Sequence, residues 1–466
     1  MDMKYVKNII FEMRKVFLFL SVLSLGMNGI EAQNLNSGYF LDGYTYRHEL
    51  NPAIVGDSYV SIPVVGQFHV GVRGNVGLEN FLFNTPTYGL TTALNPEVSA
   101  QQFLGDLSDN NKLAINLKTT ILSTGFKAFG GFNTIGVNFR MHTGVNIPYG
   151  LFEFAKRGMQ GDTHYQLDNL SIRANGYVEM ALGHARQIND NLSVGAKLKF
   201  LLGGADLDAT MDEMDIRLSE ERWLVRARAR VNTSLKGARY TLDDDGLVDG
   251  IDVDSPGLGG FGMGLDLGAS YKFTDGALKG LSLSASLLDL GFINWSENVV
   301  AYNHGDDFVF DGFHNVALDD DGEAREIDEQ LDDLQDDLEK LYNVHTDGKV
   351  GSRSTSLAAT MNIGVEYALP VYDKLKFGFL SSTNFNDVFT WTEARFSANV
   401  NPVKWFGAGV NYAFSTYGSS LGLILNFHPK GFNFFVGTDC MLGDVNTQFI
   451  PLDSNASVTM GLNVIL

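Results

Sequence analysis

An alternation of apolar residues with small or charged residues recurs along this chain and constrains its fold most strongly. It is clearest from Phe261 to Phe273, where every second residue is apolar and the residues between are glycine, serine, aspartate or lysine. Successive side chains of a strand point to opposite faces, so this segment is predicted to be a strand with one apolar face. The other face is too small and polar for a packed core. We therefore expect the apolar face to contact lipid and the polar face to line a wet lumen.

The same pattern returns in many segments up to the last residue. A strand that crosses an outer membrane needs about 9–11 residues, and several alternating runs are close to this length. Examples are 134–142, 192–200, 357–369, 406–414 and 457–466. The sequence predicts an all-β fold, a transmembrane antiparallel β-barrel of the outer membrane with about 14 to 16 strands. The higher number counts 207–219 and 221–235 as strands of the wall, and the lower number treats them as an extracellular hairpin.

Composition agrees with a barrel and argues against one class of partner. The mean hydropathy of −0.03 is ordinary for strands that are half polar. The 51 glycines and 12% aromatic residues suit curved strands and the aromatic girdles of a membrane barrel. The net charge of −21 excludes nucleic acid as a partner, because neutralising phosphates requires clustered lysine and arginine. Outer-membrane lipid is the expected surrounding.

The N-terminus has the pattern of an export signal. Arg14 and Lys15 precede an apolar run at 16–25, and Ala32 offers a small residue before a cleavage point. We therefore predict a signal peptide at 1–32 and export to the outer membrane of a Gram-negative bacterium. The polar, irregular segment 33–56 is predicted to be an N-terminal plug or periplasmic segment, and 57–466 the barrel.

Connection lengths predict how the barrel is oriented. Short turns are expected on one side and longer connections on the other. The short turns are at 189–191, 275–276, 370–373, 401–402 and 429–431, and the longer connections are 143–166, 241–257 and 296–354. Outer-membrane barrels have short periplasmic turns and long external loops, so the second group is predicted to be extracellular.

The extracellular loops are strongly acidic. Loop 304–348 is predicted to contain a helix at 323–342, because apolar residues recur there at three- and four-residue spacing among aspartates and glutamates. This helix either packs on its own loop or binds an envelope protein. Two acidic runs beside a glycine are either solvated acidic loops or calcium sites, and both depart from the standard calcium loop. The candidate ligands are Asp243, Asp245, Asp249, Asp319 and Asp321.

Charged residues are also expected on the lumen side of the strands. Arg226, Arg228 and Arg230 alternate with apolar residues, so all three are predicted to point into the lumen. Three carboxylates are expected to face the same space from other strands, namely Glu179, Asp266 and Glu366. These charges either pair and close the lumen or line an anion-selective conduit. The sequence contains no HExxH or CxxC motif, and we predict that the protein is not an enzyme.

Three segments of the chain resemble a known group of barrels. Asn51-Pro52-Ala53, ahead of the first predicted strand, resembles an element near the N-terminus of FadL-type long-chain fatty-acid channels. Segments 177–202 and 287–295 add to this, and together they are similar to an uncharacterised Bacteroidetes-type family related to FadL and to PorV-like secretion accessory barrels. The resemblance implies a FadL-like barrel plugged or gated by its N-terminal segment. Segment 33–56 departs from the transport members, because it carries Asp42, Arg47, His48 and Glu49 instead of a long apolar hatch.

Two functions follow from these observations. The first is a FadL-like channel or transport barrel for small amphipathic or anionic solutes, which the lumen arginines favour. The second is a non-transporting interaction barrel, an accessory subunit of a secretion, assembly or surface-anchoring complex. The polar N-terminal segment and the acidic loop favour the second function.

Overall fold

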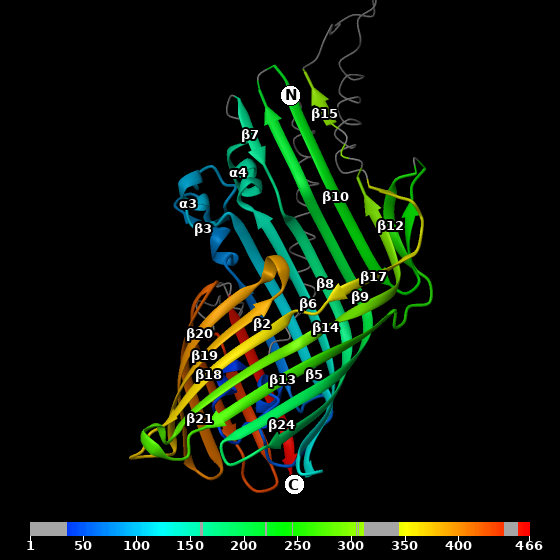
Figure 1. The fold of residues 1–466 in the computed structure, drawn as a ribbon. Helices are drawn as coiled ribbons and strands as arrows, with labels where there is room; N and C mark the ends of the chain where they lie inside the picture. Colours follow the sequence, from blue (N-terminus) through cyan, green and yellow to red (C-terminus); the bar gives the residue numbers. More distant parts are fainter. Residues whose placement is uncertain are drawn as a thin grey trace, which may run out of the picture.

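The barrel is a closed antiparallel ring of 14 strands in the computed structural model (Figure 1). The structure describes residues 35–158, 162–219, 221–244, 246–303, 305, 307–311, 344–441 and 455–466. The predicted signal peptide at 1–32 and the predicted helix at 323–342 therefore lie outside the described residues. In ring order the wall strands are β1 (Tyr59–Ser61) with β2 (Phe68–Gly74), β5 (Asn110–Ala128), β6 (Gly131–Pro148), β8 (Leu170–Gln187), β9 (Leu192–Leu218), β13 (Gly260–Lys272), β14 (Leu281–Tyr302), β18 (Ala359–Ala368), β19 (Leu375–Phe385), β20 (Trp391–Val403), β21 (Phe406–Ser415), β22 (Gly418–Phe427), β23 (Asn433–Thr438) and β24 (Ala456–Ile465).

The first and last strands close the ring. β24 pairs with both β1 and β2, so that Tyr59 lies opposite Ile465 and Phe68 opposite Met460. β1 and β2 pair on their other side with β5 and together occupy one position in the wall. Closure leaves the ring without a free edge, which is how a barrel satisfies its backbone hydrogen bonds in lipid.

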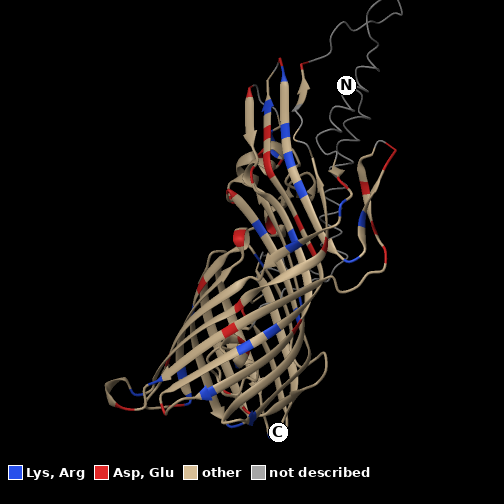
Figure 2. Ribbon diagram, turned by 45° about the vertical axis from the view of Figure 1, so that its right-hand side comes forward, with Lys and Arg blue, Asp and Glu red and all other residues tan. Residues whose placement is uncertain are grey.

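The outward face of the wall is apolar. On β13, Phe261 is 55% exposed and Leu265 is 37% exposed, whereas Gly264 and Asp266 are buried inside. Charged residues gather in the extension above the barrel and at the turns below it (Figure 2). Among the described residues, no helix is long and apolar enough to cross a membrane. The sequence alternation is therefore confirmed as the alternation between the outer and inner faces of a transmembrane barrel.

We expect a charge on this outer face to impair insertion. Leu265→Arg or Met361→Arg would place a guanidinium in lipid and cost about 2–4 kcal/mol near the bilayer midplane. Both residues are exposed on the wall, at 37% and 39%. The measurement is the heat-modifiable fraction after folding into lipid vesicles, with Leu265→Met as the control. Equal folding yields for Leu265→Arg and Leu265→Met would contradict this orientation.

A tall extension rises from one side of the ring (Figure 1). β9 continues above the end of β13, and β10 (Trp223–Leu235) pairs with it from Ala205 to Leu218. The two segments 207–219 and 221–235 thus form a hairpin outside the closed wall, so the count is 14 strands and not 16. The other described strands on this side are β7 (Thr163–Gln166), β11 (Ala238–Leu242), β12 (Val248–Val253), β15 (Asp307–Phe310), β16 (His345–Thr346) and β17 (Gly351–Ser356).

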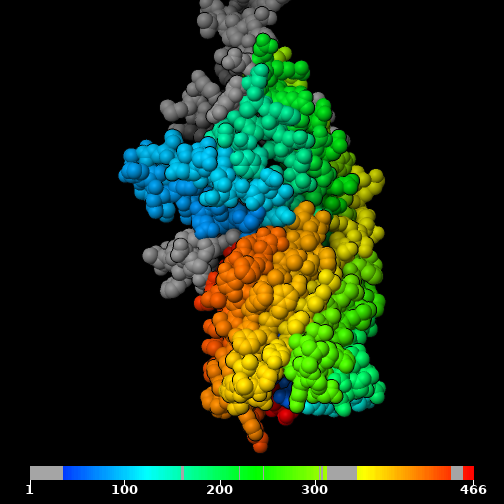
Figure 3. Space-filling model, turned by 60° about the vertical axis from the view of Figure 1, so that its left-hand side comes forward, coloured from blue at the N-terminus to red at the C-terminus, as the bar shows by residue number. Residues whose placement is uncertain are grey.

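A small apolar lobe projects beside the extension (Figure 3). Its core joins Phe103 of α3 (Ala100–Leu104) to Phe152 of α4 (Tyr149–Arg157). Ser99 caps α3 by accepting a hydrogen bond from the backbone of Gln102. The lobe also holds η2 (Leu78–Asn80), β3 (Leu82–Thr85) and β4 (Gly89–Thr92).

The N-terminal segment lies inside the barrel, near the end that carries the short turns (Figure 1). Residues 35–56, called the plug from here on, contain η1 (Asn36–Gly38) and the short helix α2 (Arg47–Leu50). Its buried side chains share one apolar cluster with inward-facing wall residues such as Phe132, Leu380 and Phe435. From the plug, this cluster contains Leu35, Tyr39, Phe40, Leu41, Tyr44, Tyr46 and Leu50.

Candidate functional site

The plug bonds to the wall at Asn51-Pro52-Ala53. Asn51 is fully buried, and its side-chain amide donates to the backbone oxygens of Ala269 and Ala285, each at 3.3 Å. Its Oδ1 accepts the backbone N–H of Ala53 at 2.9 Å, which holds the tripeptide in a turn. The tripeptide therefore bonds directly to the wall strands β13 and β14.

Two wall glycines make this contact possible. A Cβ at Gly268 would lie 2.2 Å from Asn51 Oδ1, and a Cβ at Gly195 would lie 2.1 Å from the backbone oxygen of Pro52. Real side chains are not found at such separations, so residues larger than glycine would force the plug away. The small residues on the lumen face thus have a specific role, because they let a second backbone approach the wall.

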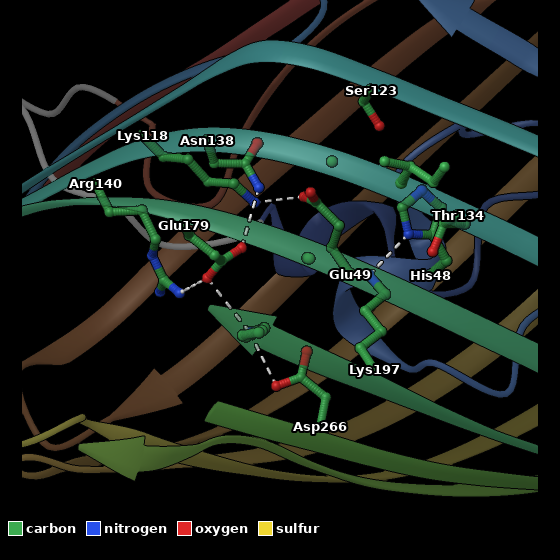
Figure 4. Close-up of a pocket in the computed structure, with 14 residues that line it drawn as sticks. His48, Glu49, Lys118, Ser123, Thr134, Asn138, Arg140, Glu179, Lys197 and Asp266 are labelled. Atoms are coloured by element: carbon green, nitrogen blue, oxygen red, sulfur yellow. Dashed lines mark hydrogen bonds and ion pairs between the residues drawn. The ribbon is translucent and has the colours of Figure 1, made fainter. Parts of the chain in front are cut away.

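Helix α2 adds charged contacts to this docking (Figure 4). His48 lies 2.8 Å from the Tyr59 hydroxyl through Nε2 and 2.9 Å from Lys197 Nζ through Nδ1. The neighbouring Glu49 forms an ion pair with Lys118 of β5. The plug is therefore held by ionic and hydrogen-bonding groups as well as by apolar packing.

An ionic cluster lies in the lumen next to α2. Lys199 Nζ is 2.8 Å from Asp266, 2.6 Å from Asp289 and 3.5 Å from Glu179. Arg140 approaches Glu179 and Asp289 at 2.9 Å each. These five residues come from β6, β8, β9, β13 and β14, so the cluster ties five neighbouring strands together. We call them the ionic cluster.

The left-handed backbone of Asp289 places this carboxylate. Asp289 has φ = 58° and lies where the pairing between β13 and β14 shifts register. Its backbone N–H donates to Asp266 Oδ1 at 2.7 Å. Aspartate tolerates this conformation better than most residues with a Cβ. The bulge thus adds one carboxylate to the lumen that a regular strand would not present there.

A second group of charges fastens the start of the plug. Arg395 contacts Glu393 at 3.0 Å, and Glu393 also accepts from Arg73 at 3.3 Å and from the Asn36 amide at 2.8 Å. Asp439 accepts the backbone N–H groups of Asn36 and Ser37 at 2.9 and 2.7 Å. The plug is thus anchored at both of its ends.

A cavity of about 90 Å³ lies next to the ionic cluster, among wall residues that adjoin the extension. Arg140 and Asp289 of the cluster form part of its lining. Its other polar and aromatic lining residues include Arg73, Asn116, Asn175, Tyr177, Trp295 and Trp391. A smaller space of about 20 Å³, drawn in Figure 4, separates α2 from the cluster and is large enough for a water molecule.

The sequence between residues 52 and 439 matches one family model. The chain belongs to DUF5723, a family of unknown function. This match includes most of the barrel and begins inside the Asn-Pro-Ala element. No curated protein matches the chain.

Solved structures with a similar fold include two toluene transporters and one hydrocarbon channel. The toluene transporter TbuX of Ralstonia pickettii is 8% identical, with 94% of this chain and 96% of that chain covered and a TM-score of 0.39. TodX of Pseudomonas putida is 9% identical, with 94% and 98% covered and a TM-score of 0.38. The monoaromatic hydrocarbon channel CymD is 8% identical, with 91% and 92% covered and a TM-score of 0.32. Similarity this low transfers no substrate to the DUF5723 protein.

The predicted lumen carboxylates lie at two levels of the barrel. Glu179 and Asp266 belong to the ionic cluster, whereas Glu366 pairs with Lys376 at 3.0 Å. Lys376 also contacts Asp42 of the plug at 2.7 Å. Burial opposes the ionisation of Asp42, but the positive charges of Arg47 and Lys376 outweigh it and hold the pKa of Asp42 below its usual value.

The three predicted lumen arginines lie elsewhere. Arg226, Arg228 and Arg230 are exposed on β10, with Val225 and Ala227 buried on its opposite face. β10 belongs to the extension, so these arginines do not line the closed barrel. Their cross-strand neighbours on β9 are Asp215, Glu213 and Thr210. The alternation identified their common face, but it could not indicate that the strand lies above the ring.

The predicted calcium ligands remain a sequence prediction. Asp245, Asp319 and Asp321 lie outside the described residues. Asp249 accepts the Thr241 hydroxyl at 2.5 Å, and Asp243 accepts the backbone N–H of Leu247 at 2.8 Å. Within the part of the chain that the structure describes, no three histidine, cysteine or acidic side chains gather as metal ligands.

The cations of the ionic cluster were missed at the sequence level. Lys199 alternates with apolar residues in the same way as Asp266 does, which is the signal that could have found it. Arg140 lies on the polar face of another alternating run. What the sequence lacks is the height of each residue in the barrel, and height decides which opposite charges meet.

Proposed function

We propose that this protein is a transport barrel for small solutes in the outer membrane of a Gram-negative bacterium, closed in this state by its plug. The observation that carries the proposal is the position of the plug, whose apolar side chains pack against inward-facing wall residues inside the barrel. A purely structural barrel needs no such separate segment. An open ring of this size would leave a path through the membrane, and a plug gives the barrel a means of closing that path.

The contacts that hold the plug are of kinds that can be broken when the plug moves, so we infer that the plug can be displaced. Ion pairs and hydrogen bonds such as Lys118 to Glu49 and Asp439 to Ser37 can exchange for water when the plug moves. The apolar cluster around Tyr44 and Phe435 opposes release and keeps the closed state dominant. A solute that displaces the plug must therefore supply differential binding energy, or a partner must do so.

A reversible disulfide between plug and wall tests this gate. A Cβ at Gly422 would lie 2.6 Å from Ser37 Oγ, which is within reach of a disulfide, but 2.3 Å from Asn411 Oδ1, so Asn411→Ala is added to every cysteine variant to make room for the new side chain. Cys440 is the only cysteine of the chain, and Cys440→Ser removes competing thiol chemistry. Ser37→Cys with Gly422→Cys in this background gives a plug that is locked when oxidised and free when reduced.

We expect solute uptake into protein-containing liposomes to be blocked in the oxidised variant and restored by reductant. The matched controls are Cys440→Ser alone and each single cysteine in the same background, whose uptake should not respond to reductant. Equal uptake in the oxidised and reduced variants would contradict a plug-gated pathway. No uptake in any protein would contradict transport.

The second candidate is a non-transporting interaction barrel, an accessory subunit of a secretion, assembly or surface-anchoring complex, as in PorV-like proteins. The tall β9–β10 extension favours it, because a hairpin that stands beyond the wall contributes nothing to a pore. The predicted 323–342 helix would add a second contact for an envelope protein. A detergent pull-down with and without residues 322–346 tests this candidate. A stoichiometric partner that is lost with the deletion, combined with no solute uptake, would replace the transport proposal.

A further inference from the structure

A second part of the chain crosses the lumen, at the end of the barrel that carries the long connections. Residues 386–390, called the mouth turn from here on, join β19 to β20 and contain η4 (Asp387–Phe389). β19 and β20 stand almost across the ring from β6 and β8. The mouth turn nevertheless contacts both of these distant strands. It therefore spans the opening of the barrel.

Phe389 makes the apolar contact between the mouth turn and β6. Its side chain is 2% exposed, and its ring centroid lies 5.9 Å from that of His142, edge to face. A Cβ at Gly144 would lie 2.7 Å from the Phe389 ring, so glycine is what leaves room for the ring. Asn386 adds a polar contact, because its Nδ2 lies 3.4 Å from His142 Nε2. β6 thus has a seat for the mouth turn, as β13 has one for the plug.

Arg173 of β8 holds the mouth turn from its exposed side. Arg173 Nη2 lies 2.6 Å from Asp387 Oδ2, and the Asp387 side chain is 64% exposed. Exposed ion pairs contribute little stability. The backbone hydrogen bonds of the turn, from Phe389 to Asn386 at 2.8 Å and from Thr390 to Asp387 at 3.0 Å, lie within it. The turn can therefore leave the opposite wall as one unit while it keeps these hydrogen bonds.

The mouth turn covers the 90 Å³ cavity. Asn386 and Phe389 line this cavity from the turn, and Arg140 and Asp289 line it from the ionic cluster. The plug approaches the cluster from its other side, where the smaller space separates α2 from residues such as Glu179. A solute that passes through the barrel would therefore meet the mouth turn at one end and the plug at the other.

We propose that the mouth turn is a second gate, which opens the cavity to the extracellular side independently of the plug. Opening requires that Phe389 leaves Gly144 and that Arg173 and Asp387 exchange each other for water. Two gates in series let a solute enter the cavity while the plug still closes the short-turn end. This inference rests on the proposed transport function and deepens it, because it gives the pathway a barrier at each end.

A metal clamp between the mouth turn and β6 tests the second gate. Asn386→His places a second imidazole near His142 Nε2, and the 3.4 Å between the native groups suits two Zn–N bonds of about 2.0–2.1 Å. The reporter is Ala114→Cys in the Cys440→Ser background. Ala114 is buried, lines the cavity and pairs with Gly144. The measurement is the rate at which this thiol reacts, in detergent, with 2-sulfonatoethyl methanethiosulfonate.

We expect zinc to slow the reaction in Asn386→His and EDTA to restore it, because the clamp holds the turn closed. With zinc at about ten times the Kd of the clamp, the rate should fall about tenfold. The matched controls are the reporter with native Asn386 and the reporter with both Asn386→His and His142→Gln. Neither control should respond to zinc.

Gly144→Ala changes the second gate in the opposite direction. Its methyl group would displace the Phe389 ring, so the reporter thiol should react about fivefold faster or more. Gly136→Ala is the matched control on the same strand and the same inner face. Its added Cβ would approach its nearest neighbours at no less than 3.8 Å, so the rate should stay unchanged.

The possible results separate the second gate from transport. A rate that responds to zinc and to Gly144→Ala, in a protein that takes up no solute, would support a mouth turn that opens the cavity and would remove transport alone. Uptake into liposomes with a rate that neither change affects would overturn the second gate alone. Fast reaction of the reporter in every variant would also overturn it, because the cavity would then be open without movement of the turn.

Discussion

Gly268→Ala is expected to unseat the plug while leaving the barrel folded. The added Cβ would lie 2.2 Å from Asn51 Oδ1 and 2.9 Å from both the Ala53 nitrogen and Pro52 Cδ. All three neighbours belong to the turn itself, which cannot yield without losing the Asn51 bonds to the wall. Overpacking of this kind costs about 1–3 kcal/mol. The fraction of molecules with a displaced plug should therefore rise by about 5- to 150-fold, since 1.4 kcal/mol changes an equilibrium constant by a factor of ten.

Gly264→Ala is the matched control for this experiment. Gly264 lies on the same strand and the same inner face, but its added Cβ would approach its nearest neighbours at no less than 3.4 Å. We expect protease to cleave residues 35–56 faster in Gly268→Ala, with raised solute uptake into liposomes and unchanged heat-modifiability. Equal cleavage and uptake in the two variants would contradict the role assigned to the glycine contact.

The strands of the wall could be predicted from the sequence, because the alternation of lipid-facing and lumen-facing residues can be seen within each strand. Residues such as Phe261 and Leu265 must face lipid, and a strand repeats its faces every second residue, so composition along the chain reveals the orientation. The connection lengths then separate the two ends of the barrel. Even the hairpin outside the wall was one of two predicted alternatives.

The ionic cluster could not be predicted, because it depends on register and height between strands. β8 and β9 shift register at Gly176, and β13 and β14 shift near Asp289, so counting along one strand does not give the level of a side chain on the next. The same uncertainty put Arg226 and its neighbours in the lumen, although β10 pairs with β9 above the point where β13 ends. The plug contacts are less predictable still, because segments far apart in sequence create them.

Lys199→Met is expected to be the most damaging single substitution in the lumen. Lys199 is the cation that Asp266, Asp289 and Glu179 share, at 2.8, 2.6 and 3.5 Å. When Lys199 is removed, Glu179 and Asp289 keep their ion pairs with Arg140. Asp266 loses its ion pair. Breaking a buried pair in this way costs about 3–5 kcal/mol, because a buried charge stays uncompensated. Methionine keeps most of the side-chain volume, so the loss is mainly electrostatic.

Two further variants decide whether the charge of Lys199 is responsible for the loss of stability. Lys197→Met, two residues away on the same face of β9, removes a contact with His48 and should cost only about 0.5–1.5 kcal/mol. Asp266→Asn added to Lys199→Met removes the stranded carboxylate and should recover part of the lost stability, which an additive pair would not do. The measurement is the thermal unfolding midpoint in detergent, followed by circular dichroism and by heat-modifiability. Equal losses in Lys197→Met and Lys199→Met, with no recovery in the double variant, would mean that packing and not the shared cation stabilises these five strands.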